Sequence, residues 1–187
     1  MCMEFSLSDM RKRLFALLQE EALKKGDFVL SSGKKSGYYL DGRVITLTPE
    51  GAFLTAGIFL EMLKDALPDA IGGPTLGADP IAGAVACLSH LRGYPVKTFI
   101  VRKVSKGHGM QRQVEGPRLA RGATVVLVDD VATTGGALIE AKSALDKEGI
   151  IVSRAFVIVD RQESAQENLA AAGLELESIF KISEFGV

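Results

Sequence analysis

The chain has 187 residues, of which 22 are basic and 23 acidic, and its formal net charge is −1 at neutral pH. Hydrophobic residues make up 47% and charged residues 24%, the balance of a soluble globular protein of about one domain. Two cysteines are too few for a disulfide framework or a four-cysteine zinc site, and no apolar run is long enough to span a membrane. The absence of a basic excess argues against a nucleic-acid-binding protein. We therefore expect a compact cytoplasmic protein that acts on a small molecule, with no nucleic-acid or membrane partner.

The N-terminal third is predicted to contain two helices. Apolar residues recur at helical spacing from Leu7 to Leu18, and again from Phe53 to Leu63. A stretch rich in glycine, serine and lysine, from Ser31 to Gly37, separates them and is followed by Tyr38 and Tyr39.

The rest of the chain alternates short apolar strands with helices of about a dozen residues. In chain order, the predicted elements are a strand at Ala70–Gly72, a helix capped by Asp79 and ending near Leu91, a strand at Thr98–Val101, a strand at Thr124–Val128, a turn at Asp129–Gly136, a helix at Ala137–Glu148 and a strand at Ile151–Val159. The runs Val125–Val128 and Phe156–Val159 are apolar throughout, which is typical of a parallel sheet covered on both faces. The sequence thus predicts a single α/β domain with a central parallel sheet flanked by helices.

The turn that follows the Thr124–Val128 strand is the main candidate site, because ligands of open α/β sheets bind at the carboxyl ends of the strands. The strand leads to two carboxylates, Asp129 and Asp130, and the residues Thr133 to Gly136 then enter a helix. Glycines let successive N–H groups converge at a helix start, which favours a phosphate, and carboxylates suit sugar hydroxyls or Mg²⁺. The alternative is a well-capped structural turn with no ligand.

A basic loop forms the second candidate site. Arg102, Lys103, Lys106 and His108 follow directly after a predicted strand, and the polar segment continues to Gly122. A loop of this length in a compact domain is usually functional, and its cations could neutralise a departing pyrophosphate. The alternative is an ordinary solvated basic surface loop.

These segments together resemble a known enzyme family. The segment Asp129–Ala137 resembles the diphosphate-sugar motif of type I phosphoribosyltransferases, and the run Arg-Lys-x-x-Lys-x-His-Gly from Arg102 resembles the loop of orotate phosphoribosyltransferases. The segment Phe28–Tyr39 is similar to that family's N-terminal Leu-x-Ser-Gly-x-x-Ser-x-Tyr segment, and Val159–Glu163 to its Asp-Arg-Gln-Glu turn. The likeness extends from about Leu14 to Arg161.

The resemblance implies a type I phosphoribosyltransferase-like fold, with a small hood and helix in residues 1–45 and a core in residues 46–187. It implies transfer of phosphoribosyl from phosphoribosyl pyrophosphate (PRPP) to orotate, with Mg²⁺ held mainly by PRPP and not by a protein metal site, in a homodimer that shares its active sites. The implied contacts are Arg102, Lys103, Lys106 and His108 for the diphosphate; Asp129 and Asp130 for the ribose; Val131, Ala132, Thr133, Thr134, Gly135, Gly136 and Ala137 for the 5′-phosphate loop; and Arg161 and Tyr39 for the base.

The sequence departs from the family pattern at three positions and leaves two alternatives open. Some members carry a lysine where Ser31 stands and another where Gly77 stands, and Gly37 occupies a position where proline is common. The first alternative is a phosphoribosyltransferase for a purine or for uracil, although Arg161 suits a base that bears a carboxylate. The second is a non-catalytic regulator that senses PRPP.

Overall fold

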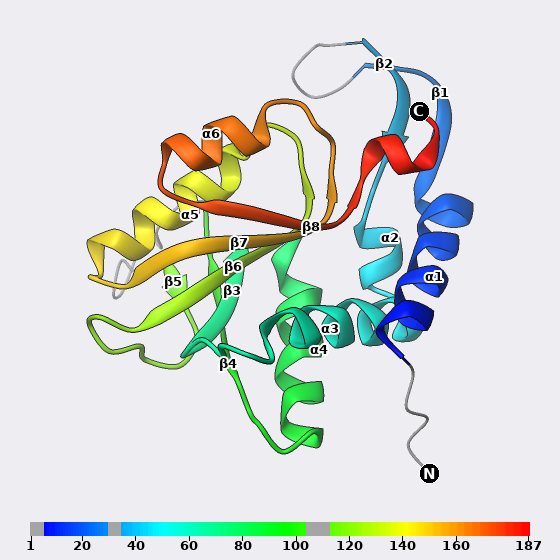
Figure 1. The fold of residues 1–187 in the computed structure, drawn as a ribbon. Coiled ribbons are helices and arrows are strands. Elements are labelled where there is room, and N and C mark those ends of the chain that lie inside the picture. Colours follow the sequence, from blue (N-terminus) through cyan, green and yellow to red (C-terminus); the bar gives the residue numbers. More distant parts are fainter. Residues whose placement is uncertain (1–5, 30–34, 104–112) are drawn as a thin grey trace.

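A computed structural model of the chain (Figure 1) describes residues 6–29, 35–103 and 113–187. Its helices are α1 (Leu7–Leu17), α2 (Arg43–Thr46), α3 (Pro49–Leu63), α4 (Ala78–Leu91), α5 (Gly136–Lys147) and α6 (Ala165–Ala171), with a π-helical turn η1 (Leu18–Ala22) and a 3-10 turn η2 (Ile182–Phe185). Its strands are β1 (Leu23–Val29), β2 (Lys35–Leu40), β3 (Ala70–Pro74), β4 (Lys97–Val101), β5 (Val114–Glu115), β6 (Thr124–Ala132), β7 (Ile151–Asp160) and β8 (Glu175–Lys181). Within the described ranges, none of the helices is both long and apolar enough to cross a membrane.

A six-stranded sheet in the order β5-β4-β3-β6-β7-β8 forms the centre of the molecule. Neighbouring strands pair in parallel, except that β5 runs antiparallel to β4. Because β3, β6 and β7 are parallel neighbours, their carboxyl ends meet at one edge of the sheet. The turns that follow these three strands therefore lie side by side.

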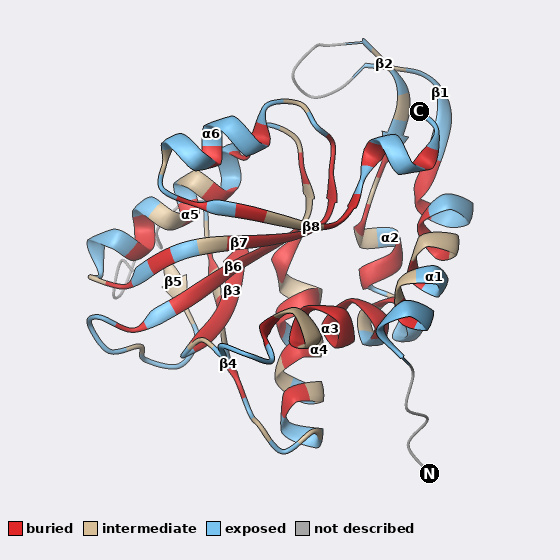
Figure 2. Ribbon diagram, viewed as in Figure 1, coloured by how far each residue is buried: buried red, intermediate tan, exposed pale blue. Residues whose placement is uncertain are grey.

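Helices cover both faces of the sheet, as the uninterrupted apolar runs predict. Figure 1 shows α3 and α4 on one face and α5 and α6 on the other. Val126 and Val128 of β6 belong to the core that includes α3 and α4, whereas Val125 and Leu127 belong to the core on the α5 and α6 face. Figure 2 shows the resulting continuous burial of the central strands. The predicted α/β fold with a mostly parallel sheet is confirmed.

A second, two-stranded antiparallel sheet is formed by β1 and β2, beside α1. Figure 1 shows this hairpin above the carboxyl edge of the main sheet, close to the C-terminal end of the chain. The ring of Phe15 in α1 stacks on Phe185 in η2 at 4.4 Å between centroids and meets Phe180 of β8 edge-on at 5.4 Å. These aromatic contacts fix the N-terminal elements to the end of the main sheet.

Two local predictions are wrong. Asp79 is not the cap of α4: the helix begins at Ala78 with Gly77 in the cap position, and Asp79 lies in its first turn. The turn predicted from Asp129 begins later, because β6 continues to Ala132. Its residues pair with β7 as far as Ala132 opposite Asp160, and this long-range pairing outweighs the weak strand preference of aspartate.

Candidate active site

Asp129 and Asp130 lie at the carboxyl end of β6, in the middle of the sheet edge. Asp129 Oδ1 accepts the N–H of Asp130 at 3.0 Å, and Asp130 Oδ1 accepts the N–H of Val131 at 2.9 Å. Asp129 is only 9% exposed, and burial, together with the neighbouring Asp130, raises its pKa well above the ordinary value. Burial also raises the pKa of Asp130. A buried and a partly buried carboxylate, side by side at the sheet edge, are poised to accept hydrogen bonds from a ligand's hydroxyls.

Two glycines let the backbone approach this acidic pair, and a third lets β3 approach the backbone just before it. A Cβ atom on Gly77 would overlap the Asp129 carboxylate and would lie 2.5 Å from Asp130 Oδ1. A Cβ on Gly42 would lie 2.8 Å from the Cβ of Asp130, and one on Gly73 would overlap the carbonyl oxygen of Val128. The turn between β3 and α4 and the start of α2 therefore pack directly on the two carboxylates, which only glycine permits.

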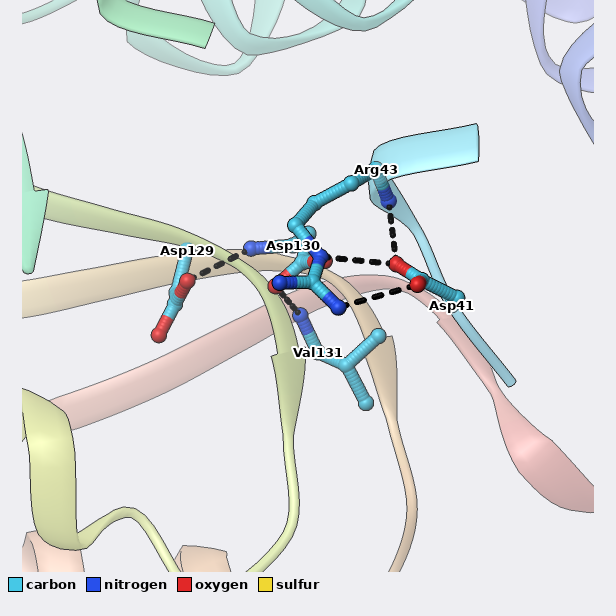
Figure 3. A network of polar contacts seen from close by, with 5 residues as sticks. All are labelled: Asp41, Arg43, Asp129, Asp130 and Val131. Atoms are coloured by element: carbon cyan, nitrogen blue, oxygen red, sulfur yellow. Dashed lines mark hydrogen bonds and ion pairs between the residues drawn. The ribbon is translucent and has the colours of Figure 1, made fainter. Parts of the chain in front are cut away.

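An ion pair from the N-terminal elements stands beside Asp130 (Figure 3). Arg43 donates from Nε and Nη2 to the two oxygens of Asp41, at 2.8 and 2.9 Å, and its backbone N–H donates to Asp41 Oδ1 at 3.1 Å. The guanidinium lowers the pKa of Asp41 and also favours the charged form of Asp130. Asp41 and Arg43 belong to none of the sequence motifs; their only signal is a position shortly after the tyrosine pair.

The segment from Thr133 to Ala137 connects β6 to α5 as a phosphate-binding turn would. Gly135 has a φ of 79°, and α5 begins at Gly136, so the turn brings backbone N–H groups to the positive end of the helix dipole. The carbonyl oxygen of Thr134 accepts a hydrogen bond from Asn168 Nδ2 at 2.9 Å. Thr134, Gly136 and Ala137 are exposed and accessible to a ligand.

Val131 and Ala132, also predicted to bind phosphate, belong to β6. They pair with Val159 and Asp160 of β7, and the carbonyl oxygen of Ala132 accepts the N–H of Arg161 at 2.9 Å. Their backbone thus also holds the turn after β7 at the same edge of the sheet, and their contact with a phosphate stays a prediction.

Arg102 and Lys103 follow β4 and line a cavity of about 600 Å³ together with Thr75, Leu76 and Asp79. Arg102 Nη1 lies 3.5 Å from Glu115 Oε1 on β5. The cavity is bounded by the same turn that packs on the acidic pair, which places these two cations near the site. Lys106 and His108 lie outside the described residues.

Arg161 follows β7 and is 7% exposed. Its Nε donates to the hydroxyl of Tyr38 at 3.2 Å, and the guanidinium carbon lies 4.7 Å from the centroid of the Tyr38 ring. Tyr39, which was predicted to stack on the base, is 38% exposed, and its ring lies 5.7 Å from that of Phe28. The tyrosine beside Arg161 is therefore Tyr38, because neighbouring residues of a strand point to opposite faces.

The described residues contain no group of three or more His, Cys, Asp or Glu side chains placed to hold a metal ion. The acidic pair supplies only two carboxylates. This donor set fits Mg²⁺ that is bound mainly through a substrate's phosphates, since Mg²⁺ retains waters and takes few protein ligands.

Comparison with known proteins agrees with this geometry. A family model described as a phosphoribosyl transferase domain matches residues 46–186. The orotate phosphoribosyltransferase of Thermosynechococcus vestitus is 45% identical over 184 residues, which cover 97% of this chain and 96% of that protein. The chain belongs to the orotate phosphoribosyltransferase family. A second orotate phosphoribosyltransferase, from Aquifex aeolicus, is 46% identical over 177 residues, 93% of this chain and 96% of that protein.

Solved orotate phosphoribosyltransferases share the fold. A crystal structure of the Mycobacterium tuberculosis H37Rv enzyme in complex with Fe(III) dicitrate aligns with a TM-score of 0.83 and 35% identity, covering 95% of this chain and 99% of that one. The same orotate phosphoribosyltransferase in complex with PRPP aligns with a TM-score of 0.79 and 31% identity over the same shares. The family predicted from the four sequence motifs is confirmed.

Proposed function

We propose that the whole chain acts as one domain that transfers phosphoribosyl from PRPP to orotate, giving orotidine 5′-monophosphate and pyrophosphate. The observation that carries this proposal is the meeting of three features at one sheet edge. These are the acidic pair Asp129 and Asp130, the glycine turn that opens α5, and the buried guanidinium of Arg161. Together they suit a phosphorylated sugar and an anionic base.

Each group then has a chemical role. The turn from Thr133 to Ala137 holds the 5′-phosphate, Asp129 and Asp130 accept hydrogen bonds from the ribose hydroxyls, and Arg161 pairs with the carboxylate of orotate. The bond between the anomeric carbon and the diphosphate oxygen breaks as an orotate nitrogen attacks the opposite face. No covalent enzyme intermediate is required, so positioning and charge stabilisation supply the catalysis.

The negative charge that develops on the leaving diphosphate requires cations. Arg102 and Lys103 line a cavity with the turn between β3 and α4, and we assign them to the diphosphate. We assign the same role to Lys106 and His108 on the basis of the family motif. Mg²⁺ bound to the diphosphate would neutralise part of the same charge.

We further propose that the enzyme is a homodimer whose subunits meet beside the active site. Leu47 is 72% exposed and Leu76 64% exposed, and both line an apolar cavity of about 530 Å³ next to Arg43 and Asp79. Exposed apolar surface of this kind is typical of a protein interface. Light scattering after size-exclusion chromatography should give twice the chain mass. Leu47→Asp should shift the mass toward that of one chain, whereas Leu91→Asp, at another exposed leucine, should leave it unchanged. A wild-type monomer would refute this assignment.

The loss of orotate's ultraviolet absorbance on addition of PRPP and Mg²⁺ tests the function. Orotate consumption should require both PRPP and Mg²⁺, and one pyrophosphate should be released for each orotate consumed. Adenine, hypoxanthine and uracil, offered in place of orotate, should react far more slowly, since none offers a carboxylate to Arg161. Faster turnover of a neutral base would favour the alternative acceptor, and PRPP binding without turnover of any base would favour the regulator.

A further inference from the structure

The guanidinium of Arg161 is already engaged by the protein itself. Besides the contact of Nε with Tyr38, Nη2 lies 2.8 Å from Oε1 of Glu163, two residues further along the chain. The Glu163 side chain is 28% exposed, whereas that of Arg161 is 7% exposed. A buried guanidinium without an anion would be costly, and Glu163 removes this cost while no substrate is bound.

The engaged nitrogens matter because a carboxylate binds arginine best through two adjacent N–H groups. Tyr38 occupies Nε and Glu163 occupies Nη2, so the protein fills the fork that these two nitrogens form. A carboxylate that binds both nitrogens of this fork must displace the hydroxyl of Tyr38 from Nε and the carboxylate of Glu163 from Nη2.

The turn around Glu163 is held in an unusual backbone conformation. The residues on either side, Gln162 and Ser164, have φ values of 55° and 70°, in the left-handed region that favours glycine. Asp160 Oδ1 accepts the N–H of Gln162 at 2.8 Å, and the Gln162 side-chain oxygen accepts the N–H of Ser183 at 3.3 Å. Residues kept in such conformations cluster at ligand-binding and switch segments. The ends of the turn are fixed, and Glu163 stands between them.

We propose that Glu163 sets the affinity for the base by acting through Arg161, because its carboxylate holds Arg161 in the free enzyme and gives way to the carboxylate of orotate. This inference rests on the proposed function, which assigns Arg161 to orotate. Binding then exchanges one carboxylate for another on a buried guanidinium, and no net ion pair is gained. A neutral base has no carboxylate to replace Glu163 and leaves the internal pair intact. Glu163 is thus a positioning residue that weakens the binding of anionic bases and eases release of the orotidine product.

Glu163→Gln tests the exchange because it removes the competing charge and keeps the size of the side chain. The KM for orotate and its dissociation constant by calorimetry should fall about twofold to fivefold, the range expected for one partly exposed ion pair. The KM for PRPP and inhibition by uracil should stay unchanged. Glu163→Asp, which retains the charge, should lie between the wild type and Glu163→Gln. Glu167→Gln removes the same charge from an exposed position in α6 and should behave as the wild type.

An unchanged or increased KM for orotate in Glu163→Gln, with wild-type thermal stability, would overturn the proposal. If Glu163→Gln is unstable, the same comparison is decided by Glu163→Asp, whose KM for orotate should fall rather than rise. Failure of the underlying function is distinguishable. Arg161→Gln should abolish orotate binding while PRPP binding persists, and retained orotate binding would refute the assignment of Arg161 itself.

Discussion

Replacing Gly77 with alanine places one methyl group against the acidic pair. The new Cβ would overlap the Asp129 carboxylate and stand 2.5 Å from Asp130 Oδ1, and it has little room to move away, because Gly77 and Asp129 are both buried. To restore an ordinary contact, the turn and the carboxylates must separate by at least about 1 Å. Overpacking of this kind costs about 1–3 kcal/mol of stability, and a displacement of about 1 Å at a reacting centre can cost about 10²-fold in rate.

The assay is orotate consumption, together with thermal unfolding of the same preparations. Gly77→Ala should lose about 10²-fold in kcat/KM, and its Tm should fall by about 2–4 °C for each kcal/mol lost. Gly83→Ala is the matched control, since a Cβ there meets nothing within 4 Å and alanine favours the interior of α4. Gly77→Lys, which introduces the lysine of some related enzymes, should fail in the same way as alanine. Wild-type turnover in Gly77→Ala would refute the close packing of the turn on the acidic pair.

Three further changes test other parts of the site. Because burial raises the pKa of Asp129, the folded protein keeps a proton that the unfolded chain loses above about pH 4, so the free energy of unfolding falls as the pH rises through the raised pKa. Asp129→Asn should therefore be inactive, yet at pH 8 its Tm should be higher than that of the wild type. This difference in Tm should shrink toward pH 4.5, and an equal difference at the two pH values would contradict the raised pKa of Asp129. Gly135→Ala should lower the Tm and weaken PRPP binding, since a side chain is strained at a φ of 79° and its Cβ would lie 2.8 Å from the Leu169 side chain. If calorimetry gave an unchanged PRPP affinity, this segment would not be a phosphate-binding turn. Lys106→Ala should reduce turnover about 10²–10³-fold with an unaltered Tm, and unaltered turnover would remove this lysine from the leaving-group site.

The sheet and the acidic pair could be predicted from the sequence because their signals are local. A strand buried on both faces reads as a continuous apolar run, and the runs in β6 and β7 are of this kind. The position of Asp129 at the end of such a run, followed by glycines and a helix, places it at the ligand-binding edge.

The rest of the site depends on contacts between distant segments. Strand β1 is mostly exposed and has no alternating apolar pattern, so only its pairing with β2 defines it. The same pairing decides that Tyr38 faces Arg161 and Tyr39 does not. The ion pair of Arg43 with Asp41 belongs to the site because Arg43 acts on Asp130, which lies almost ninety residues further along the chain. No local sequence pattern indicates that these segments meet.

The aromatic contacts of Phe15 with Phe180 and Phe185 have a consequence for biosynthesis. Most of the apolar face of α1 packs on α3, which follows it closely in the chain, but Phe15 packs on rings some 165 residues further along. The Phe15 ring therefore stays uncovered during synthesis until the segment that carries Phe180 and Phe185 has been made. The hairpin that brings Tyr38 to Arg161 follows α1 in the chain, so the base pocket should be completed only after this late contact forms.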